Sequence, residues 1–286
     1  MNIRIITDSA SDITGMDRKD ITFLPLSVAF GDKIYQDNVD LSHEEFYQKL
    51  AASKDLPTTS QVSPHAFQAV FQRTVAAGEI GIVIAISSKL SGTYQSAVIA
   101  AQEFPGQIFV VDSLSVSLGQ HILVDLALRL KDQGLDASAI LAQLEEKKKD
   151  IRLIALMHTL EYLKRGGRVS RTAAFAGGLL SIKPVIAIQN GEIAILGKAR
   201  GSKQGNNLLV QQIRNSGGVD FSQPYVLGYT GTDDTLIQTY IQDCEALWKP
   251  YVSTLPISTI GGTIGTHAGP GAIGVAFFAK KPESDA

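Results

Sequence analysis

Cysteine, net charge and long apolar runs are all scarce in this sequence, and each scarcity excludes a class of protein. A single cysteine, Cys244, excludes an intramolecular disulfide framework. A formal net charge of −2 gives no support to nucleic-acid binding. The apolar runs are far shorter than the roughly 20 residues that span a bilayer, so no membrane span is expected. Residues 1–6 read as a strand and not as a signal peptide, so we expect a cytoplasmic protein.

Familiar catalytic and metal-binding motifs are missing as well. The chain has no G-x-S-x-G elbow, no P-loop and no G-x-G-x-x-G after a strand. The histidines, at positions 43, 65, 121, 158 and 267, do not have the spacing of metal ligands. We therefore expect no metal and no cofactor, and any site has to be found in less specific patterns.

The pattern of apolar residues predicts an α/β protein with two domains. A length of 286 residues with 44% hydrophobic residues is ample for two cores. In the first half, predicted strands and helices alternate, which is typical of a mostly parallel sheet. The predicted strands are residues 3–7, 21–29, 82–86 and 107–112, and the predicted helices are 43–52, 65–77, 94–104, 116–132 and 136–149.

The second half has a different pattern, and we place the boundary near residues 150–155. An N-terminal α/β domain would then span 1–153 and a C-terminal α+β domain 154–286. Asn190-Gly191 between two apolar runs is a strong hairpin signal. The remaining elements are predicted as strands at 151–157, 183–189, 193–196, 225–230 and 251–258, and as helices at 160–164, 202–215 and 233–247.

The segment 80–101 is the most informative stretch of the first half. A buried strand, Ile82–Ile86, runs through a loop of serine, glycine and threonine, residues 87–93, into a helix. Free backbone N–H groups and hydroxyls at a helix N-terminus suit a carboxylate or a phosphate. The alternative is that Ser91 or Thr93 only caps the helix.

Two further stretches of polar residues follow predicted strands or lie in loops. Asp8 and Asp12 come at the end of the first strand, where open α/β sheets bind ligands, although both could equally form turns or caps. Pro57 and Pro64 bracket a loop that contains Thr58, Thr59, Ser60 and Gln61. Ser63 is explained as a helix cap, whereas four consecutive hydrogen-bonding side chains suit a ligand loop.

The C-terminal half has a glycine-rich segment and a basic segment. Six glycines surround His267 between residues 261 and 274, which predicts a flexible ligand-contacting loop rather than a histidine satisfied by its neighbours. Between residues 164 and 203 there is only one acid, Glu192. This stretch is predicted to bind phosphate or an acidic partner. The alternative is that it is a solvated surface. Its cations are Lys164, Arg165, Arg168, Arg171, Lys183, Lys198, Arg200 and Lys203.

Taken together, these motifs resemble the DegV family of bacterial fatty-acid-binding proteins. Each motif is weak by itself, but six in the family's order over nearly the whole chain are specific. The departures are Val62, where the family often has proline, and Ile13, where leucine is usual. The matching motifs are residues 7–12, 57–61, 87–93, 160–168, 182–184 and 264–271.

The resemblance implies a binding protein that holds one long-chain fatty acid between its two domains. In the family the carboxylate is bound by hydroxyls of the T-T-S-Q and L-S-G-T motifs, near the histidine of G-T-H-A-G-P-G. At the matching positions stand Thr59, with Ser60 as second choice, then Ser91 with Gly92 and Thr93 in the same loop, and His267.

The resemblance also implies a partner and a pathway. Family members resemble the lipid-carrying subunit of a two-component fatty-acid kinase, whose catalytic subunit phosphorylates the bound acid with ATP to acyl-phosphate for phospholipid synthesis. The carrier is then not an enzyme by itself, and its membrane contact is at most transient. Arginines support the partner's step, and the matching residues are Arg168, then Arg171 and Arg200.

Two other classes of function stay open at the level of sequence. A serine acyl-hydrolase or acyltransferase would use Ser91 as nucleophile and His267 as base, with Asp8 or Asp112 as a guessed third member. An enzyme acting on a phosphorylated metabolite would use the loop 87–93 for phosphate.

Overall fold

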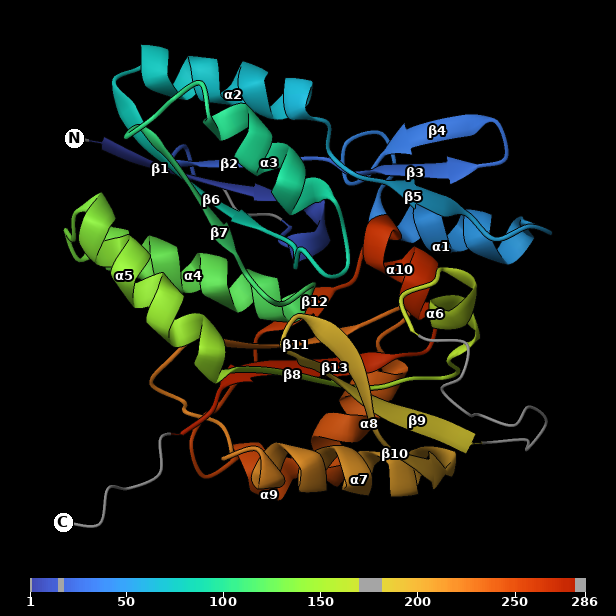
Figure 1. Cartoon of the computed structure of the whole chain (residues 1–286). Helices are drawn as coiled ribbons and strands as arrows, with labels where there is room; N and C mark the ends of the chain where they lie inside the picture. The colour runs from blue at the N-terminus through green and yellow to red at the C-terminus, as the bar shows by residue number, and fades with distance from the viewer. Residues whose placement is uncertain (1, 15–17, 170–181, 281–286) are drawn as a thin grey trace, which may run out of the picture.

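The computed structural model describes residues 2–14, 18–169 and 182–280. Two sheets lie one above the other in Figure 1, with helices outside and between them. The upper sheet has four parallel strands in the order β2-β1-β6-β7. These strands are β1 (Asn2–Asp8), β2 (Ile21–Leu24), β6 (Glu79–Ala85) and β7 (Ile108–Asp112). The predicted parallel α/β arrangement of the first half is thus confirmed.

Helices cover both faces of the parallel sheet, which explains why its strands are apolar on both sides. Residues 82–85 of β6 are fully buried. Figure 1 shows α2 (Pro64–Ala76) and α3 (Thr93–Ala101) on one face, and α4 (Leu118–Asp132) and α5 (Ala137–Lys147) on the other. Helix α5 ends at Lys147, and a 3-10 turn, η2 (Lys148–Asp150), follows it. The predicted helix end at residue 149 therefore lies within this turn.

The prediction of one strand over residues 21–29 is wrong. The segment forms β2 and a separate strand, β3 (Ser27–Phe30), because Pro25 lacks the N–H that a continuous ladder needs. β3 pairs antiparallel with β4 (Lys33–Gln36) and β5 (Thr58–Ser60) in a small sheet. The chain from β4 to β5 includes α1 (His43–Ala52). The spacing of Ser42 and Glu45 in the sequence predicts a capping box at the start of this helix, and the structure has it.

The lower sheet has six strands in the order β10-β9-β8-β13-β11-β12, all antiparallel except β11 with β12. The predicted hairpin is present, and Asn190 and Gly191 both have the positive φ that its turn requires. The strands are β8 (Ile151–Leu156), β9 (Ile182–Gln189), β10 (Glu192–Arg200), β11 (Tyr225–Tyr229), β12 (Ile257–Thr259) and β13 (Ile273–Phe278).

Three helices pack on the outer face of the six-stranded sheet: α7 (Gly201–Asn215), α8 (Thr235–Asp243) and α9 (Glu245–Trp248). The prediction of one helix over 233–247 is wrong, because the chain leaves helical geometry at Cys244, where φ is −119°. The predicted strand over 251–258 is also too early, since β12 begins only at residue 257.

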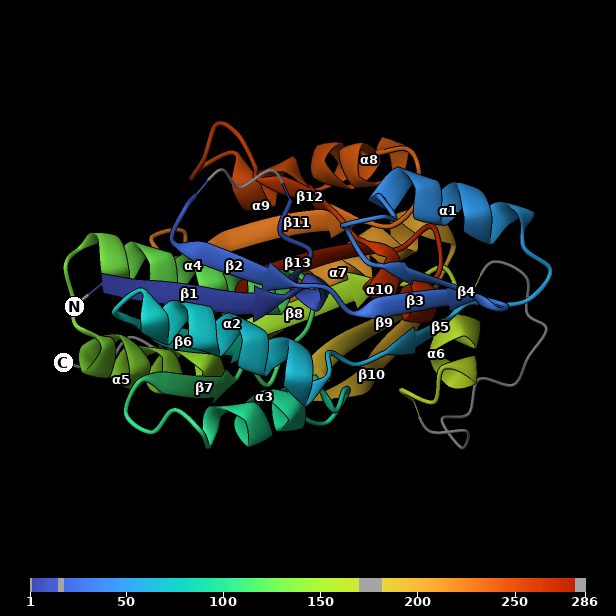
Figure 2. The ribbon, with the colours of Figure 1, turned by 90° about the horizontal axis from the view of Figure 1, so that it is seen from above.

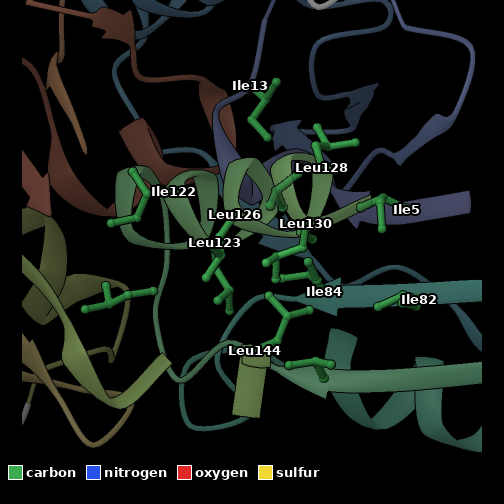
Figure 3. Packing of buried hydrophobic residues seen from close by; sticks show 14 of the residues in the cluster. Ile5, Ile13, Ile82, Ile84, Ile122, Leu123, Leu126, Leu128, Leu130 and Leu144 are labelled. Carbon is green, nitrogen blue, oxygen red and sulfur yellow. The ribbon is translucent and has the colours of Figure 1, made fainter. Parts of the chain in front are cut away.

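Helix α4 lies between the two sheets and joins their cores. Leu118, Ile122 and Leu123 are fully buried, and the same cluster includes residues of both sheets, such as Ile5 and Ala276. Figure 3 shows side chains of α4 beside Ile82 and Ile84 of β6. One apolar cluster is thus shared by both halves while others lie within a single half, and the boundary near residues 150–155 stays a prediction.

Residues 262–268 of the glycine-rich segment near the C-terminus form a helix and not the flexible loop that the composition predicts, whereas Gly269 and Gly271 after the helix do have positive φ. Helix α10 (Gly262–Ala268) packs on α1, on β3 and β5 of the small sheet, and on α6 (Glu161–Arg165). Figure 2 shows it beside β3 and β5. Gly265 has no room for a Cβ, which would lie 2.5 Å from Phe46 Cε1. The glycines therefore permit close packing here rather than mobility.

Candidate functional site

A cavity of about 380 Å³ lies between the parallel sheet and the six-stranded sheet. Its wall is mostly apolar and comes from the start of α4, from strands β8, β9 and β13, and from α10. The residues that form this apolar wall include Val116, Leu118, Leu153, Ala155, Met157, Ile186, Ala187, Ile188, Ile264 and Ile273. Such a space suits an apolar tail, because every methylene that enters it leaves water.

Polar side chains meet in one part of the cavity wall, and they come from segments far apart in the chain. Thr59 and Ser60 lie on β5, Ser91 and Gly92 lie in the loop before α3, and His267 lies in the last turn of α10. The resulting group offers hydroxyls, backbone N–H groups and a ring nitrogen beside an apolar space. An elongated molecule with one polar end fits this arrangement.

The loop before α3 keeps hydroxyls close to a helix N-terminus. Its N-cap residue, Gly92, has no side chain to satisfy the first N–H groups of α3. Ser91 Oγ accepts a hydrogen bond from the N–H of Thr93 and lies 3.0 Å from Thr93 Oγ1. The capping interpretation is therefore correct in part, since Ser91 does accept a bond from the first turn while its side chain still lines the cavity.

His267 is held against Thr59, and its ring is neutral near pH 7. Nε2 of His267 and Oγ1 of Thr59 are 2.9 Å apart. The pKa of His267 is lowered to about 4, first because burial disfavours the imidazolium and second because the guanidinium of Arg168 repels it. Nδ1 is buried and has no hydrogen-bond partner among the described residues.

Arg168 stands at the exposed side of the cavity, just after α6. Its Nε donates to the carbonyl of Leu90 at 3.2 Å and its Nη1 donates to the carbonyl of Gly166 at 2.7 Å. A shallower hollow of about 700 Å³ shares Arg168 with the cavity and is also lined by Lys89 and Glu192. Cationic groups therefore lie next to the polar part of the apolar cavity.

A family model described as "Uncharacterised protein, DegV family" matches residues 2–280. The chain belongs to the DegV family. It is 38% identical over 284 residues to a DegV domain-containing protein of Caldanaerobacter subterraneus subsp. tengcongensis, covering 98% of this chain and 99% of that one.

Solved structures of DegV proteins have the same fold over nearly the full length. A fatty-acid-binding DegV-family protein from Thermus thermophilus matches with a TM-score of 0.87 and 34% identity, over 98% of this chain and 100% of that one. A stearic-acid-binding protein from Eubacterium ventriosum matches with a TM-score of 0.86 and 28% identity, over 96% and 97% of the two chains. The resemblance drawn from the six motifs is thus confirmed at the level of family and fold.

Most of the predicted site residues of this DegV chain come together in the structure. Thr59, Ser60, Ser91, Gly92, Arg168 and His267 all line the cavity. Thr93 is fully buried beneath it, and its Oγ1 accepts a hydrogen bond from Val62 N–H at 3.3 Å, so it ties α3 to the segment after β5. In the described chain, the cavity lining does not include Thr93.

Of the two other predicted arginines of this DegV chain, only Arg200 lies in the described residues. Arg200 is an exposed residue at the end of β10 and the N-cap of α7, where its backbone N–H donates to Gln204 Oε1. In the described residues it does not line the cavity. Arg171 lies outside the described residues.

Sequence reasoning missed two groups that shape the site. Gln61 was included in a polar loop but not singled out, although its amide lies against Gly92 and donates to Ser96 Oγ at 2.9 Å. The apolar wall was also missed, because an isoleucine beside a cavity has the same sequence pattern as one in a packed core. Among the described residues, no helix could cross a membrane and no cluster of metal-ligating side chains occurs.

Proposed function

We propose that this protein binds one long-chain fatty acid in the cavity between its sheets, with the carboxylate at Thr59 and Ser91 near His267. The observation that carries the proposal is an apolar cavity of about 380 Å³ whose wall includes hydroxyls from two segments and a neutral histidine. The solved DegV structures described as binding fatty acids support the same ligand class.

The apolar wall supplies most of the affinity in this proposal. Burial of a methylene contributes about 0.8 kcal/mol, so about fifteen methylenes contribute roughly 12 kcal/mol. Association costs roughly 4–15 kcal/mol in lost translational and rotational freedom, and tail burial offsets most or all of this. The polar end of the cavity then fixes orientation and selects a carboxylate.

The neutral histidine orients the hydroxyl of Thr59. If the ring proton is on Nε2, it is donated to Thr59 Oγ1 across the 2.9 Å contact. The buried Nδ1 is then only an unpaired acceptor, and no N–H is left without a partner. Thr59 can direct its own hydroxyl proton toward the carboxylate, as Ser91 can from the other side, and hydrogen bonds to a charged group are the stronger kind.

We further propose that the protein presents the bound acid to a partner kinase, which phosphorylates the carboxylate to acyl-phosphate. The support is the position of Arg168 between the cavity and the shallower hollow, where its guanidinium can stabilise a phosphoryl group. Arg171 and Arg200 are proposed to assist, Arg200 from outside the cavity.

The lipid is tested by mass spectrometry of the purified protein, first native and then denatured with organic extraction. We expect a mass excess that matches one C14–C18 fatty acid and disappears on denaturation. Ligand-free protein would then be offered oleic and palmitic acid. Failure to bind either acid contradicts the proposal.

The kinase step is tested with oleate-loaded protein, ATP and the purified catalytic subunit of a bacterial fatty-acid kinase. Hydroxylamine traps acyl-phosphate as a hydroxamate, so product is measured directly. We expect Arg168→Ala to lose product by at least about 100-fold, the size of effect seen when one donor to a transition-state charge is removed. Arg73→Ala, an exposed arginine on α2, is the matched control and should keep full yield.

An acyl-hydrolase is the less supported function, because the histidine faces a different hydroxyl. His267 Nε2 contacts Thr59, whereas Ser91 contacts Thr93. Asp8 and Asp112 accept backbone hydrogen bonds from Ile86 and from Leu114, respectively. A Ser91→Ala variant separates the two functions, since a carrier loses fatty-acid affinity while a hydrolase loses esterase activity that the wild type must first display.

A further inference from the structure

The N-terminus of α10 is held by two buried carboxyl groups from the first 40 residues of the chain. Asp37 Oδ1 accepts from Gly262 N–H at 3.0 Å and Oδ2 accepts from Thr263 N–H at 3.1 Å. Asp12 Oδ1 accepts from Gly261 N–H at 2.8 Å. Each aspartate is only 1% exposed. The N–H of the N-cap residue, Gly261, and the first two N–H groups of the helix therefore depend on side chains more than 220 residues away.

The helix has no side-chain cap of its own, so these contacts are not redundant. Its N-cap residue is Gly261, which makes no side-chain cap bond. A Ser, Thr, Asp or Asn at that position would supply the usual local acceptor. Both oxygens of Asp37 accept, which is the hydrogen-bond pattern of an ionised carboxylate and gives stronger bonds than neutral groups do.

The face of α10 that packs on α1 carries glycines, so α1 approaches the backbone of the helix closely. Gly262 and Gly265 lie against Phe46, and Gly265 also lies against the hydroxyl of Tyr47. Glycines on this face leave no side chain of α10 to interdigitate with α1. The hydrogen bonds from Asp12 and Asp37 hold the N-terminal end of the helix, in addition to the apolar packing of Ile264.

The other end of α10 carries the histidine of the proposed carboxylate site. Thr263 and His267 are four residues apart, so roughly 6 Å of helix separates the Asp37 contact from the ring. The helix is short and hydrogen-bonded throughout, with Gly265 N–H bonded to Gly261 and Gly269 N–H bonded to Gly265. A displacement at the N-terminus is therefore transmitted to the contact between His267 and Thr59.

We propose that Asp37, together with Asp12, is a positioning residue for the carboxylate site: it sets the axial position of α10 and thereby holds His267 on Thr59. Among the described residues, neither aspartate lines the cavity, so Asp37 acts through the helix. Asp12 also accepts a hydrogen bond from Ser117, which does line the cavity, so Asp37 is the cleaner test of the two. The effect of Asp37 on the preference for a carboxylate ligand rests on the proposed fatty-acid function. Its effect on the contact between His267 and Thr59 does not.

The first test uses ligand-free protein and the ¹⁵N resonances of its histidine rings. Asp37→Asn keeps the shape of the side chain but replaces one acceptor with an NH₂ group, and Asp12→Asn is a second, independent variant. His267→Gln assigns the signal. We expect the His267 Nε2 resonance to move in each folded aspartate variant, which reports a changed contact with Thr59.

The matched control is Asp136→Ala. Asp136 is the exposed N-cap of α5, and its carboxylate accepts a hydrogen bond from Ala139 N–H at 2.8 Å. It should lower stability and leave the His267 resonance unchanged. Unchanged His267 resonances in the folded Asp37→Asn and Asp12→Asn proteins would overturn the inference, because the aspartates would then be caps without influence on the histidine.

The second test compares oleic acid with oleyl alcohol, which has the same tail and no carboxylate. We expect the preference of Asp37→Asn for the acid to be about tenfold lower than that of the wild type, the size expected when one hydrogen bond to a charged group is lost. An equal loss of affinity for both ligands would contradict a positioning role. A wild type that binds neither overturns the proposed function, while the resonance measurement still decides the role of Asp37.

Discussion

At the scale of the residue, the neutral state of His267 makes stability depend on pH. Its pKa in the folded protein is about 4, against 6.5 for a free histidine, because burial and Arg168 disfavour the charged ring. A lowered pKa means that the stabilising contribution is present above pH 6.5 and is lost as the pH falls toward 4. Between pH 6.5 and pH 4 the ring is protonated in the unfolded chain and neutral in the folded protein, so acid favours the unfolded chain.

The first prediction concerns this loss of stability at low pH. The free energy of unfolding of the wild type, relative to His267→Gln, should fall by about 3 kcal/mol between pH 7 and pH 4. Urea unfolding at pH 4, 5, 6 and 7 measures it. A relative free energy that does not change over this range would show that the ring is not buried in a neutral state.

The comparison with His267→Gln is necessary because Asp8 contributes a pH dependence of opposite sign. Burial raises the pKa of Asp8 to about 6, despite hydrogen bonds from Ile86 and Ala10 that favour its ionised form. Its stabilising contribution is complete below pH 3.8 and is lost as the pH rises through 6. The two groups therefore partly cancel in the wild type, and only the difference isolates His267.

At the scale of the element, α10 shows how composition misleads. Six glycines within residues 261–274 predict a loop, because glycine favours turns and weakens helices. The helix forms nonetheless because Asp12 and Asp37 accept hydrogen bonds at its N-terminus, and it needs glycine at position 265 because α1 approaches too closely for a larger residue. Both causes lie in distant parts of the chain.

The second prediction concerns that close approach. Gly265→Ala should lower the free energy of unfolding by about 1–2 kcal/mol, because overpacking against Phe46 and Tyr47 outweighs the roughly 1 kcal/mol that alanine contributes to a helix. Urea unfolding at pH 7 measures the change.

Gln211→Ala, at an exposed position of α7, is the control for that measurement. It should change stability by less than about 0.5 kcal/mol. A Gly265→Ala protein as stable as the wild type would mean that α10 can move away from α1 without loss.

At the scale of the whole molecule, the two halves share the buried apolar cluster around α4. Leu118, Ile122 and Leu126 of α4 belong to the same buried cluster as Ile84 of the parallel sheet and Leu153 of the six-stranded sheet. A fragment ending at residue 153 would expose the side of α4 that faces the second sheet. The cavity lies at this junction, so a tail bound in it would contact both halves.

The third prediction is therefore a single unfolding transition. Trp248, the only tryptophan, reports the C-terminal half, and a Phe23→Trp, Trp248→Phe variant reports the N-terminal half from a partly exposed position. Both fluorescence signals and far-UV circular dichroism should give the same urea midpoint. Two separated midpoints would instead support two independently stable domains on either side of residue 153.

The sequence by itself determined the parallel α/β half, the capping box at Ser42, the Asn190-Gly191 hairpin and the family. These are local signals: the period of apolar residues, a cap three residues from its partner, a two-residue turn and motifs in a fixed order. Local patterns also indicated Ser91, His267 and the polar loop with Thr59 as candidates, but only the resemblance related these residues to one another.

Only the tertiary structure decided which of these residues meet, and where. The contact between Thr59 and His267 spans 208 residues, and the contact between Asp12 and Gly261 spans 249, so no local pattern encodes either one. The helical state of residues 262–268 and the position of the cavity were decided in the same way. Each depends on what packs against the segment, and that is set by long-range burial and by distant hydrogen-bond partners rather than by local propensity.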